Sequence, residues 1–571
     1  MSSFIKALDQ HTSRNLGEKG HIQEGWSNDH RKQICQLYFQ LVRCKDHKSL
    51  ESSWVKILSS FIGKERERIN DFKVVIKMVA NVRDVKSGKG ECQLSYMMLY
   101  HLYNYYPSLA QLVFKKFLNL TDDTHCLGSY KDIKYMCDYI KNKTCNENHD
   151  FINYILDHSM HLLKVEELNY EKGEKNSLLA KWLPRAKSKK FGWIFNKLAL
   201  IYYPHYLKTA KSIHKRNMAY KKAKTNLRKL LSKINKRIDT TQIRMAGQDW
   251  KNIDFEKVTG PTLRVHKKAF QNVDKNGAQR SQSLDRISCA DNLKTHIEES
   301  KKGNRVVKAQ RVDMFKLVKD AITANNSLEI DMVNEQWKDN AGINVESDHY
   351  MIPMGDTSGS MSCDDNIPMY NSIGFSIRVS EKTHPAFRHR IMTFSREPTW
   401  FQLNEHMTFH QKVTTMKQDN NWGANTDFYK AMEMILKVCL DNNVPPTDVE
   451  KMILVIFSDM QIDVAQGSIN LTTMMENIRL LFSEAGMKSM WGKAYPVPHI
   501  LFWNLRKTDG FPNCVYEKNT SMISGYSPVM LNAFSEKGFD ELKSVTPFKM
   551  LEDILRNNRY NFVDIHCVTM Y

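Results

Sequence analysis

In the stretch Asp356-Thr357-Ser358-Gly359-Ser360, the oxygen-bearing side chains of Asp356, Ser358 and Ser360 stand at alternate positions. Further along the chain, Thr426 and Asp459 add another hydroxyl and another carboxylate, each in a predicted loop. Carboxylate and hydroxyl oxygens suit a hard divalent cation, and Mg²⁺ prefers near-octahedral oxygen coordination that includes some waters. The predicted metal ligands are therefore Asp356, Ser358, Ser360, Thr426 and Asp459, with Mg²⁺ or Mn²⁺ as the cofactor.

The elements that must position these side chains begin near residue 349, where apolar runs of strand length alternate with segments of helical periodicity. This alternation predicts a doubly wound α/β sheet with helices on both faces. Loops at the carboxyl ends of neighbouring strands meet in such a sheet, so ligands distant in sequence are expected to converge. The predicted strands are 350–355, 389–394, 399–402, 452–458, 499–504 and 522–524, and the predicted helices are 369–381, 409–416, 427–440, 472–484, 528–535 and 547–557.

The five ligands resemble the metal-ion-dependent adhesion site (MIDAS) of von Willebrand factor A domains, which consists of Asp-x-Ser-x-Ser, a distant Thr and a distant Asp. Neighbouring segments resemble one uncharacterised family of plants and large DNA viruses, whose C-terminal domain is von Willebrand A-like. Its N-terminal part is distantly similar to the TROVE domain of the Ro ribonucleoprotein autoantigen. The matching segments are Asp356–Met361, Met392–Ser395, Trp422–Phe428, Phe457–Met460, Phe502–Arg506 and Ser524–Ser527, and the resemblance runs from about Gly20 to the C-terminus.

The resemblance implies a site that binds protein partners through the metal. Hydroxyl ligands are neutral, so a metal held by them and by two carboxylates stays electrophilic enough to accept a carboxylate from a partner. An acidic-residue-bearing protein is therefore the expected partner at this site. A vestigial site that is kept for folding is the alternative, because Gly, Ser, Asp and Thr are also common loop residues.

A metal-dependent phosphotransferase or hydrolase is a further alternative for the same residues. In haloacid-dehalogenase phosphotransferases a strand-terminal Asp is the nucleophile, and an Asp two residues later is the general acid. Here the second position is Ser358, which cannot serve as an acid near neutral pH. We therefore expect a binding protein and no enzyme.

Positive charge is concentrated in the N-terminal part of the chain. Of the 83 basic and 63 acidic residues, 21 and 24 lie in 351–571, which leaves 62 basic and 39 acidic residues in 1–350. A basic domain joined to a nearly neutral one indicates a polyanionic partner for the first, with RNA as the expected one. Apolar runs are too short to cross a bilayer, so we expect an intracellular, cytoplasmic protein without a membrane partner, in the host cytoplasm or the virion if the chain is viral.

Three regions are predicted along the chain. Residues 1–30 form a polar lead-in, 31–345 a basic α-helical domain, and 346–571 the α/β domain with a C-terminal helical segment. Helical periodicity recurs through the second region, for example at 72–83, 94–106, 109–118, 133–141 and 151–163. Paired helices without long strands predict a HEAT-like, TROVE-like solenoid, although no repeat period is visible in the residues.

Residues 211–244 form the most basic stretch, with twelve Lys and Arg against the single acid Asp239. Five apolar residues at helical spacing predict that one face packs while the others stay cationic. Such a face either is simply solvated or binds RNA by releasing counterions from phosphates. The candidate RNA-binding residues are Lys215, Arg216, Lys221, Lys222, Lys224, Arg228, Lys229, Lys233, Lys236 and Arg237.

The loop 83–91 is rich in Arg, Lys and Gly, and it lacks both the spacing of a nucleotide P-loop and a preceding strand. We interpret it as a structural turn, with a contact to an RNA backbone as the alternative. Taken together, the sequence predicts a non-enzymatic, ribonucleoprotein-like binding protein. A protein–protein scaffold that does not bind RNA is the alternative, and the oligomeric state is not predicted.

Overall fold

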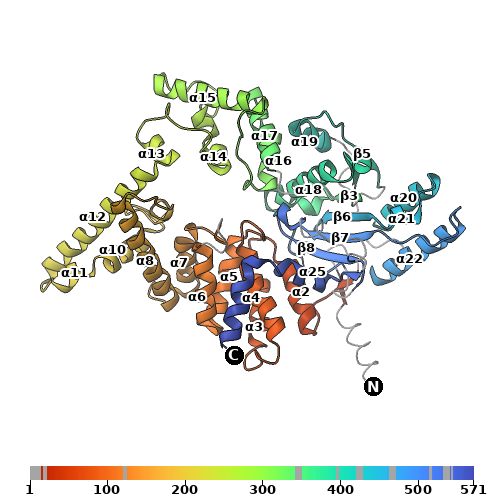
Figure 1. Cartoon of the computed structure of the whole chain (residues 1–571), viewed down its shortest axis with the longest axis horizontal. Coiled ribbons are helices and arrows are strands. Elements are labelled where there is room, and N and C mark those ends of the chain that lie inside the picture. Colours follow the sequence, from red (N-terminus) through yellow and green to blue (C-terminus); the bar gives the residue numbers. More distant parts are fainter. Residues whose placement is uncertain are drawn as a thin grey trace. The chain divides into compact units, whose positions relative to one another are not determined.

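The computed structural model describes residues 14–16, 22–119, 125–340, 350–393, 398–418, 428–461, 471–508, 510–512, 517–531, 541 and 544–570 (Figure 1). The chain divides into two units. Unit 1 comprises Met1–Val82, Lys86–Leu94 and Glu299–Tyr571, and unit 2 comprises Arg83–Val85 and Ser95–Glu298. Each unit therefore collects segments that are separated in the sequence.

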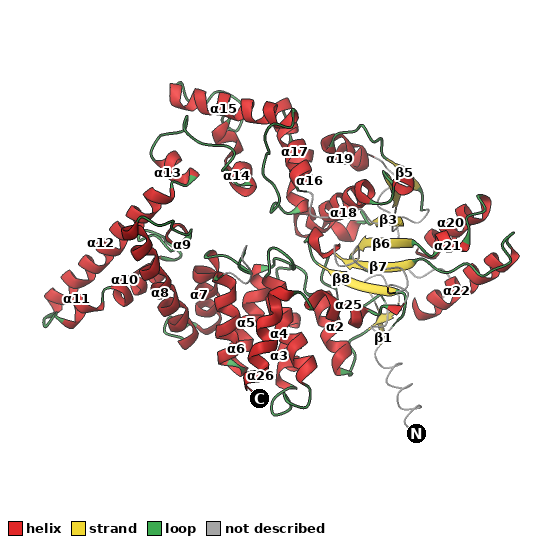
Figure 2. Cartoon of the chain, viewed as in Figure 1, coloured by secondary structure: helices red, strands yellow, loops and turns green. Residues whose placement is uncertain are grey.

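Unit 1 contains a six-stranded mixed sheet, shown in Figure 2. The strand order is β5-β4-β3-β6-β7-β8, and every neighbouring pair is parallel except β4 with β5. The predicted α/β region and its strands are confirmed to within two residues at each end. The strands are β3 (Tyr350–Gly355), β4 (Arg390–Thr393), β5 (Trp400–Gln402), β6 (Met452–Ser458), β7 (His499–Asn504) and β8 (Thr520–Ser524).

Helices pack on both faces of this sheet. Side chains of consecutive strand residues point to opposite faces, so Phe502 and Trp503 of β7 mark the two sides. Phe375 of α18 (Cys363–Lys382) lies 5.0 Å from the ring of Trp503, whereas Phe428 of α20 (Phe428–Asp441) lies 6.3 Å from that of Phe502. The other helices of this region are α19 (Phe409–Gln418), α21 (Pro446–Val449) and α22 (Leu471–Lys488). The strands are consequently buried on both sides, and every residue of β6 and β7 is buried.

The N-terminal helix α2 (His30–Gln40) belongs to the same unit as the sheet. It packs beside β8 and beside α25 (Pro547–Leu555) near the C-terminus. Asn504 at the end of β7 donates to the carbonyl of Phe39, and Ser524 at the end of β8 donates to the carbonyl of Tyr38. The sheet side chains thus bond to carbonyls in the last turn of α2, where the helix runs out of backbone donors.

The two units group the chain differently from the predicted regions, and the boundary at 345/346 stays a prediction. Residues 341–349 lie outside the described part of the chain, but helices on both sides of them share unit 1. Composition and charge do not reveal this arrangement, because it depends on hydrogen bonds between segments more than 450 residues apart.

In the predicted lead-in, β1 (Arg14–Leu16) pairs antiparallel with β2 (Ile22–Glu24). The remaining helices of unit 1 are α3 (Lys48–Ser59), α4 (Ile69–Arg83), α16 (Met314–Thr323), α17 (Ser327–Asp339) and α26 (Asn561–Met570).

The loop 83–91 contributes a buried cation to this arrangement. The ammonium of Lys89 donates to the carbonyls of Tyr38 and Leu41 at 2.6 and 3.1 Å, and to the hydroxyl of Ser524 at 2.5 Å. A cation at the C-terminal end of α2 also complements the helix dipole. Nearby, the carboxylate of Glu91 pairs with Arg43 at 2.9 Å. The interpretation of this loop as a structural turn agrees with these contacts, which use its charged side chains inside the protein.

Helices make up nearly all of the regular structure of unit 2 within its described residues. The successive helices α7, α8, α10 and α12 pack against one another as α7 on α8, α8 on α10 and α10 on α12. Arg83 and Asp132 form a buried ion pair at 2.7 Å. The helices are α5 (Cys92–Tyr105), α6 (Pro107–Leu118), α7 (Lys131–Thr144), α8 (Asp150–Lys172), α9 (Leu179–Trp182), α10 (Gly192–Tyr202), α11 (Pro204–Lys208), α12 (Ile213–Ile238), α13 (Thr241–Ala246), α14 (Gly260–Phe270) and α15 (Leu284–Lys301). The helical class is confirmed, and the solenoid stays a prediction.

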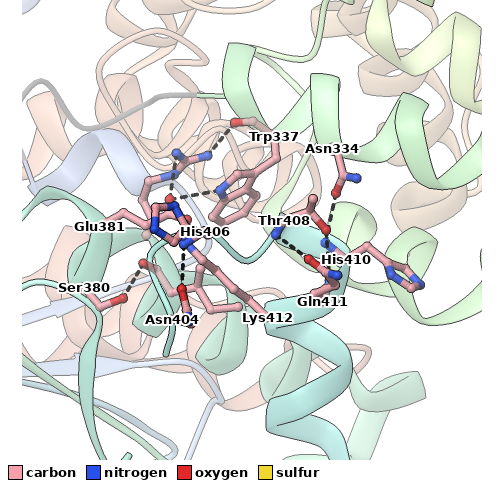
Figure 3. A network of polar contacts seen from close by, with 12 residues as sticks. Asn334, Trp337, Ser380, Glu381, Asn404, His406, Thr408, His410, Gln411 and Lys412 are labelled. Atoms are coloured by element: carbon pink, nitrogen blue, oxygen red, sulfur yellow. Dashed lines mark hydrogen bonds and ion pairs between the residues drawn. The ribbon is translucent and has the colours of Figure 1, made fainter. Parts of the chain in front are cut away.

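A polar network joins α17, α18 and α19 beside the sheet (Figure 3). The guanidinium of Arg378 lies 3.7 Å from the ring centroid of Trp337, and its Nη2 donates to the carbonyl of the same residue. The indole ring of Trp337 also stacks on the ring of Phe409, with centroids 3.8 Å apart. Glu381 accepts from the indole of Trp337 and from Lys412 at 2.8 Å, and it lies 3.4 Å from Arg378. One carboxylate therefore compensates two buried cations.

Replacing this carboxylate, as in Glu381→Gln, is expected to destabilise unit 1 by about 3–5 kcal/mol, because two buried cations lose their counterion. Urea unfolding followed by tryptophan fluorescence measures the change. The control is Glu405→Gln, which makes the same substitution at a carboxylate beside His406 at the surface, where the two side chains are 68% and 86% exposed. A Glu381→Gln variant no less stable than the control would contradict the assigned role.

Candidate functional site

The predicted metal ligands Asp356 and Asp459 follow two strands that are neighbours in the sheet. Asp356 comes directly after β3, and Asp459 comes directly after β6. The pairing of Gly355 with Phe457 places the two strand ends in register, and the amide of Asp356 donates to the carbonyl of Phe457 at 3.0 Å. The chain leaves β3 and β6 in opposite directions across the sheet, so this is the point where an open α/β sheet binds ligands.

Asp356 is fully buried and held from both sides. Its Oδ1 accepts from the amide of Ser358 at 2.8 Å, and its Oδ2 accepts from the hydroxyl of Ser458 at 2.6 Å. The hydroxyls of Ser358 and Ser360 lie 3.0 Å apart in the same turn. The structure thus brings the three ligands of the first motif together and adds Ser458, for which the sequence analysis gave no role.

Asp459 is also fully buried, and it is paired with an arginine. Arg506, two residues beyond the end of β7, donates from Nη2 and Nε to Oδ2 of Asp459 at 2.8 and 3.0 Å. The other oxygen, Oδ1, accepts from the amide of Gln461 at 3.1 Å. Sequence reasoning missed Arg506, although this residue closes the matched segment Phe502–Arg506, which was the available signal.

The loop after Asp459 has an unusual backbone. Met460 has a φ of 64°, in the left-handed region that an unbranched apolar residue rarely adopts. Its amide donates to the hydroxyl of Ser458 at 3.1 Å, and this bond ties the turn to the partner of Asp356. Strain of this kind costs of order 1–3 kcal/mol and concentrates at functional sites. The turn therefore holds Met460, directly after Asp459, in a costly backbone conformation.

The electrostatics of the two carboxylates are unfavourable without a cation. Burial, together with the charge of Asp459, raises the pKa of Asp356 to about 6. The guanidinium of Arg506 bonds to Asp459, which places one positive charge beside two buried carboxylates. Two carboxylates and two hydroxyls are the donor set that a hard divalent cation prefers, and the residues present fit Mg²⁺ or Mn²⁺.

Thr426, the fifth predicted ligand, lies outside the described residues. Across the described part of the chain, no group of three or more His, Cys, Asp or Glu side chains is placed to hold a metal. The candidate site combines two carboxylates with serine hydroxyls, so it does not belong to the class of sites with three or more such side chains.

The ten candidate RNA-binding residues all lie on α12. Nine of them are exposed and Lys224 is half-buried, while Ala223, Leu227 and Ile234 on the opposite side are buried. Near the C-terminal end of the helix, Lys233 and Arg237 lie over the ring of Tyr170, at 4.4 and 5.3 Å from its centroid. The structure therefore confirms an amphipathic helix with a cationic outer face, and it leaves RNA binding a prediction.

Comparison with known proteins finds two similarities. Residues 351–563 match a family described as a domain of unknown function (DUF7788). An uncharacterised protein, L728, of Acanthamoeba polyphaga mimivirus is 24% identical over 518 residues, which cover 88% of this chain and 82% of the relative. The chain is thus similar to an uncharacterised family with viral members. Within the described residues, no helix is long and apolar enough to span a membrane.

Replacing the arginine, as in Arg506→Gln, is expected to lower the stability of the metal-free protein by about 1.5–3 kcal/mol, because a buried carboxylate loses its charged hydrogen bonds. Added Mg²⁺ should then stabilise this variant more than the parent, since the site loses one positive charge. Thermal unfolding in chelator and in Mg²⁺ measures both effects.

The control for this prediction is Arg479→Gln, which removes an arginine from an ion pair with Glu517 at the surface. It should leave the response to Mg²⁺ unchanged. An Arg506→Gln variant that gains no more from Mg²⁺ than the parent would show that Arg506 and the metal do not share Asp459.

Proposed function

We propose that the protein is a non-enzymatic binding protein with two sites, a metal-dependent protein-binding site in unit 1 and an RNA-binding face in unit 2. The observation that carries the proposal is the convergence of Asp356, Ser358, Ser360 and Asp459 at the ends of two adjacent parallel strands. In this proposal Asp356, Ser358, Ser360, Thr426 and Asp459 hold Mg²⁺ or Mn²⁺.

The strand order supports a von Willebrand A-like, Rossmann-type assignment for this region. Counted from β3, the order of the sheet is 3-2-1-4-5-6, which is the order of Rossmann-type doubly wound sheets. The motif Asp-x-Ser-x-Ser then stands after the first strand and the distant Asp after the fourth. These positions agree with the resemblance to a metal-ion-dependent adhesion site.

The chemistry of the site favours binding over catalysis. A bound metal would supply an open coordination position for a carboxylate of the partner protein. The position that an acid would need for phosphoryl transfer holds Ser358, whose hydroxyl lies 3.0 Å from that of Ser360. Among the described residues, Asp356 and Asp459 also accept hydrogen bonds from Ser458, Arg506 and two backbone amides, and none of these groups is a general acid near neutral pH. The protein's own residues therefore orient and neutralise the site.

The RNA-binding face is proposed on the charge of α12. Exposed lysines and arginines along one helix, in the part of the chain that carries all the excess positive charge, attract a polyanion. The distant resemblance to the TROVE domain supports RNA as this polyanion. A protein scaffold without RNA binding is the alternative function. A scaffold of this kind would show no salt-dependent affinity for RNA.

The experiment for the RNA-binding face uses the full chain, because α2 packs on the sheet and a fragment ending near residue 345 would lose that contact. We expect binding to single-stranded RNA at 50 mM salt that weakens about 50-fold at 200 mM salt if four phosphates are neutralised. Fluorescence anisotropy measures the affinity. Reversing four charges of α12, as in K221E/K222E/R228E/K229E, should abolish the binding.

The matched control reverses four exposed lysines of the nearly neutral unit 1, as in K437E/K488E/K493E/K518E. This control changes the net charge by the same amount and should lower the affinity only slightly. Equal losses in the two variants would mean that RNA responds to net charge alone, and the absence of binding by the parent protein would favour the scaffold.

A further inference from the structure

A cavity of about 490 Å³ opens in unit 2 between α11 and the N-terminal half of α12. This volume lies within the usual range for small-molecule sites, roughly 300–1,000 Å³. The side chains that matter for the argument are Tyr206 of α11 and Lys215, Met218, Lys221, Lys222 and Asn226 of α12. The metal site and the C-terminal half of α12 play no part in it.

The cavity is cationic. Three of its lining residues are lysines, and none of its lining residues is acidic. Lys215 and Lys221 are exposed and make no ion pair within the described residues. The ammonium of Lys222 lies 4.5 Å from the centroid of the Tyr206 ring, so its charge lies beside an aromatic side chain of the cavity. The cavity therefore favours a negatively charged ligand.

The cavity also has a fixed aromatic wall and an exposed apolar side chain. The hydroxyl of Tyr206 accepts a hydrogen bond from the side-chain amide of Asn226 at 2.7 Å, and this bond holds the ring against α12. The ring of Tyr203 supports it in a stack, with centroids 5.7 Å apart. Met218 is 54% exposed although it is apolar. A planar group that enters the cavity would meet a held ring and a methionine, both of which pack well against aromatic surfaces.

We propose that this cavity is a nucleotide-binding site for single-stranded RNA, with the base against Tyr206 and Met218 and the phosphates near Lys215 and Lys221. The proposal rests on the proposed RNA binding of α12 and specifies its ligand. Fixed aromatic rings beside cationic side chains are the arrangement that binds single strands, because unstacked bases pack on the rings while lysines follow the backbone. Bases in a duplex are stacked and paired, so the cavity selects single strands.

The test compares two double variants of the full chain in binding to a labelled oligouridylate of twelve nucleotides. K215A/K221A removes two lysines of the cavity, and K437A/K493A removes two exposed lysines of unit 1, outside the proposed RNA-binding face. We expect the cavity variant to bind at least tenfold more weakly than the parent and the control to bind within threefold of it. Equal losses in the two variants would overturn the proposal.

A second measurement separates the base from the phosphates. An abasic strand of the same length and charge should bind at least threefold more weakly than the oligouridylate, and Met218→Ala should weaken only the binding of the oligouridylate. Equal affinity for the two strands, or equal effects of Met218→Ala on both, would show that the site recognises phosphates alone and would overturn the base-binding part.

The two proposals fail in different ways. If the parent protein binds no RNA at low salt, the proposed RNA binding of α12 fails, and the nucleotide site fails with it. If the parent and both double variants bind RNA with the same salt dependence, the cationic face stands and only the nucleotide site fails. A duplex that competes as well as the single strand would likewise overturn the selection for single strands.

Discussion

The two carboxylates at the ends of β3 and β6 are the constraint on which the proposed site depends. Asp356 and Asp459 are both fully buried, and the charge of the second adds to burial in raising the pKa of the first to about 6. Two negative groups in this position are costly unless a positive charge reaches them. Arg506 supplies one positive charge at Asp459, and a divalent cation would add the charge that the second carboxylate needs. The hydroxyls of Ser358 and Ser360 extend the donor set without adding further negative charge.

The helix α2 is the second constraint, because it covers the carboxyl ends of β7 and β8 next to this site. Asn504 and Ser524 bind the carbonyls of Phe39 and Tyr38, and the buried ammonium of Lys89 joins Tyr38 to Ser524. The loop that carries Arg506 starts from Asn504, whose side chain also accepts from the amide of Arg506 at 3.0 Å. The N-terminal helix is thereby linked, through one asparagine, to the arginine that neutralises Asp459.

Much of this arrangement can be predicted from local sequence, and the rest depends on distant contacts. The strands of unit 1 are recognisable because runs such as 452–458 are apolar and bounded by loops, and the positions of Asp356 and Asp459 follow from the strands. Arg506 and Lys89 are not predictable in this way, since an isolated cation in a loop gives no sign of a buried partner. The predicted boundary at 345/346 relied on charge and composition, which do not register the bonds from α2 to the sheet. The RNA-binding face could be predicted as an amphipathic helix, but the cavity beside Tyr206 required the packing of α11 on α12.

The most direct measurement of the central claim is a calorimetric titration of Mg²⁺ into the full-length, metal-free protein and into the variant Asp356→Asn. The substitution keeps the shape of the side chain and its ability to bond with Ser358 and Ser458, and it removes one of the two charges. We expect saturable binding of one Mg²⁺ by the parent protein and no measurable binding by the variant. An absence of saturable binding by the parent, or equal binding by both proteins, would contradict it.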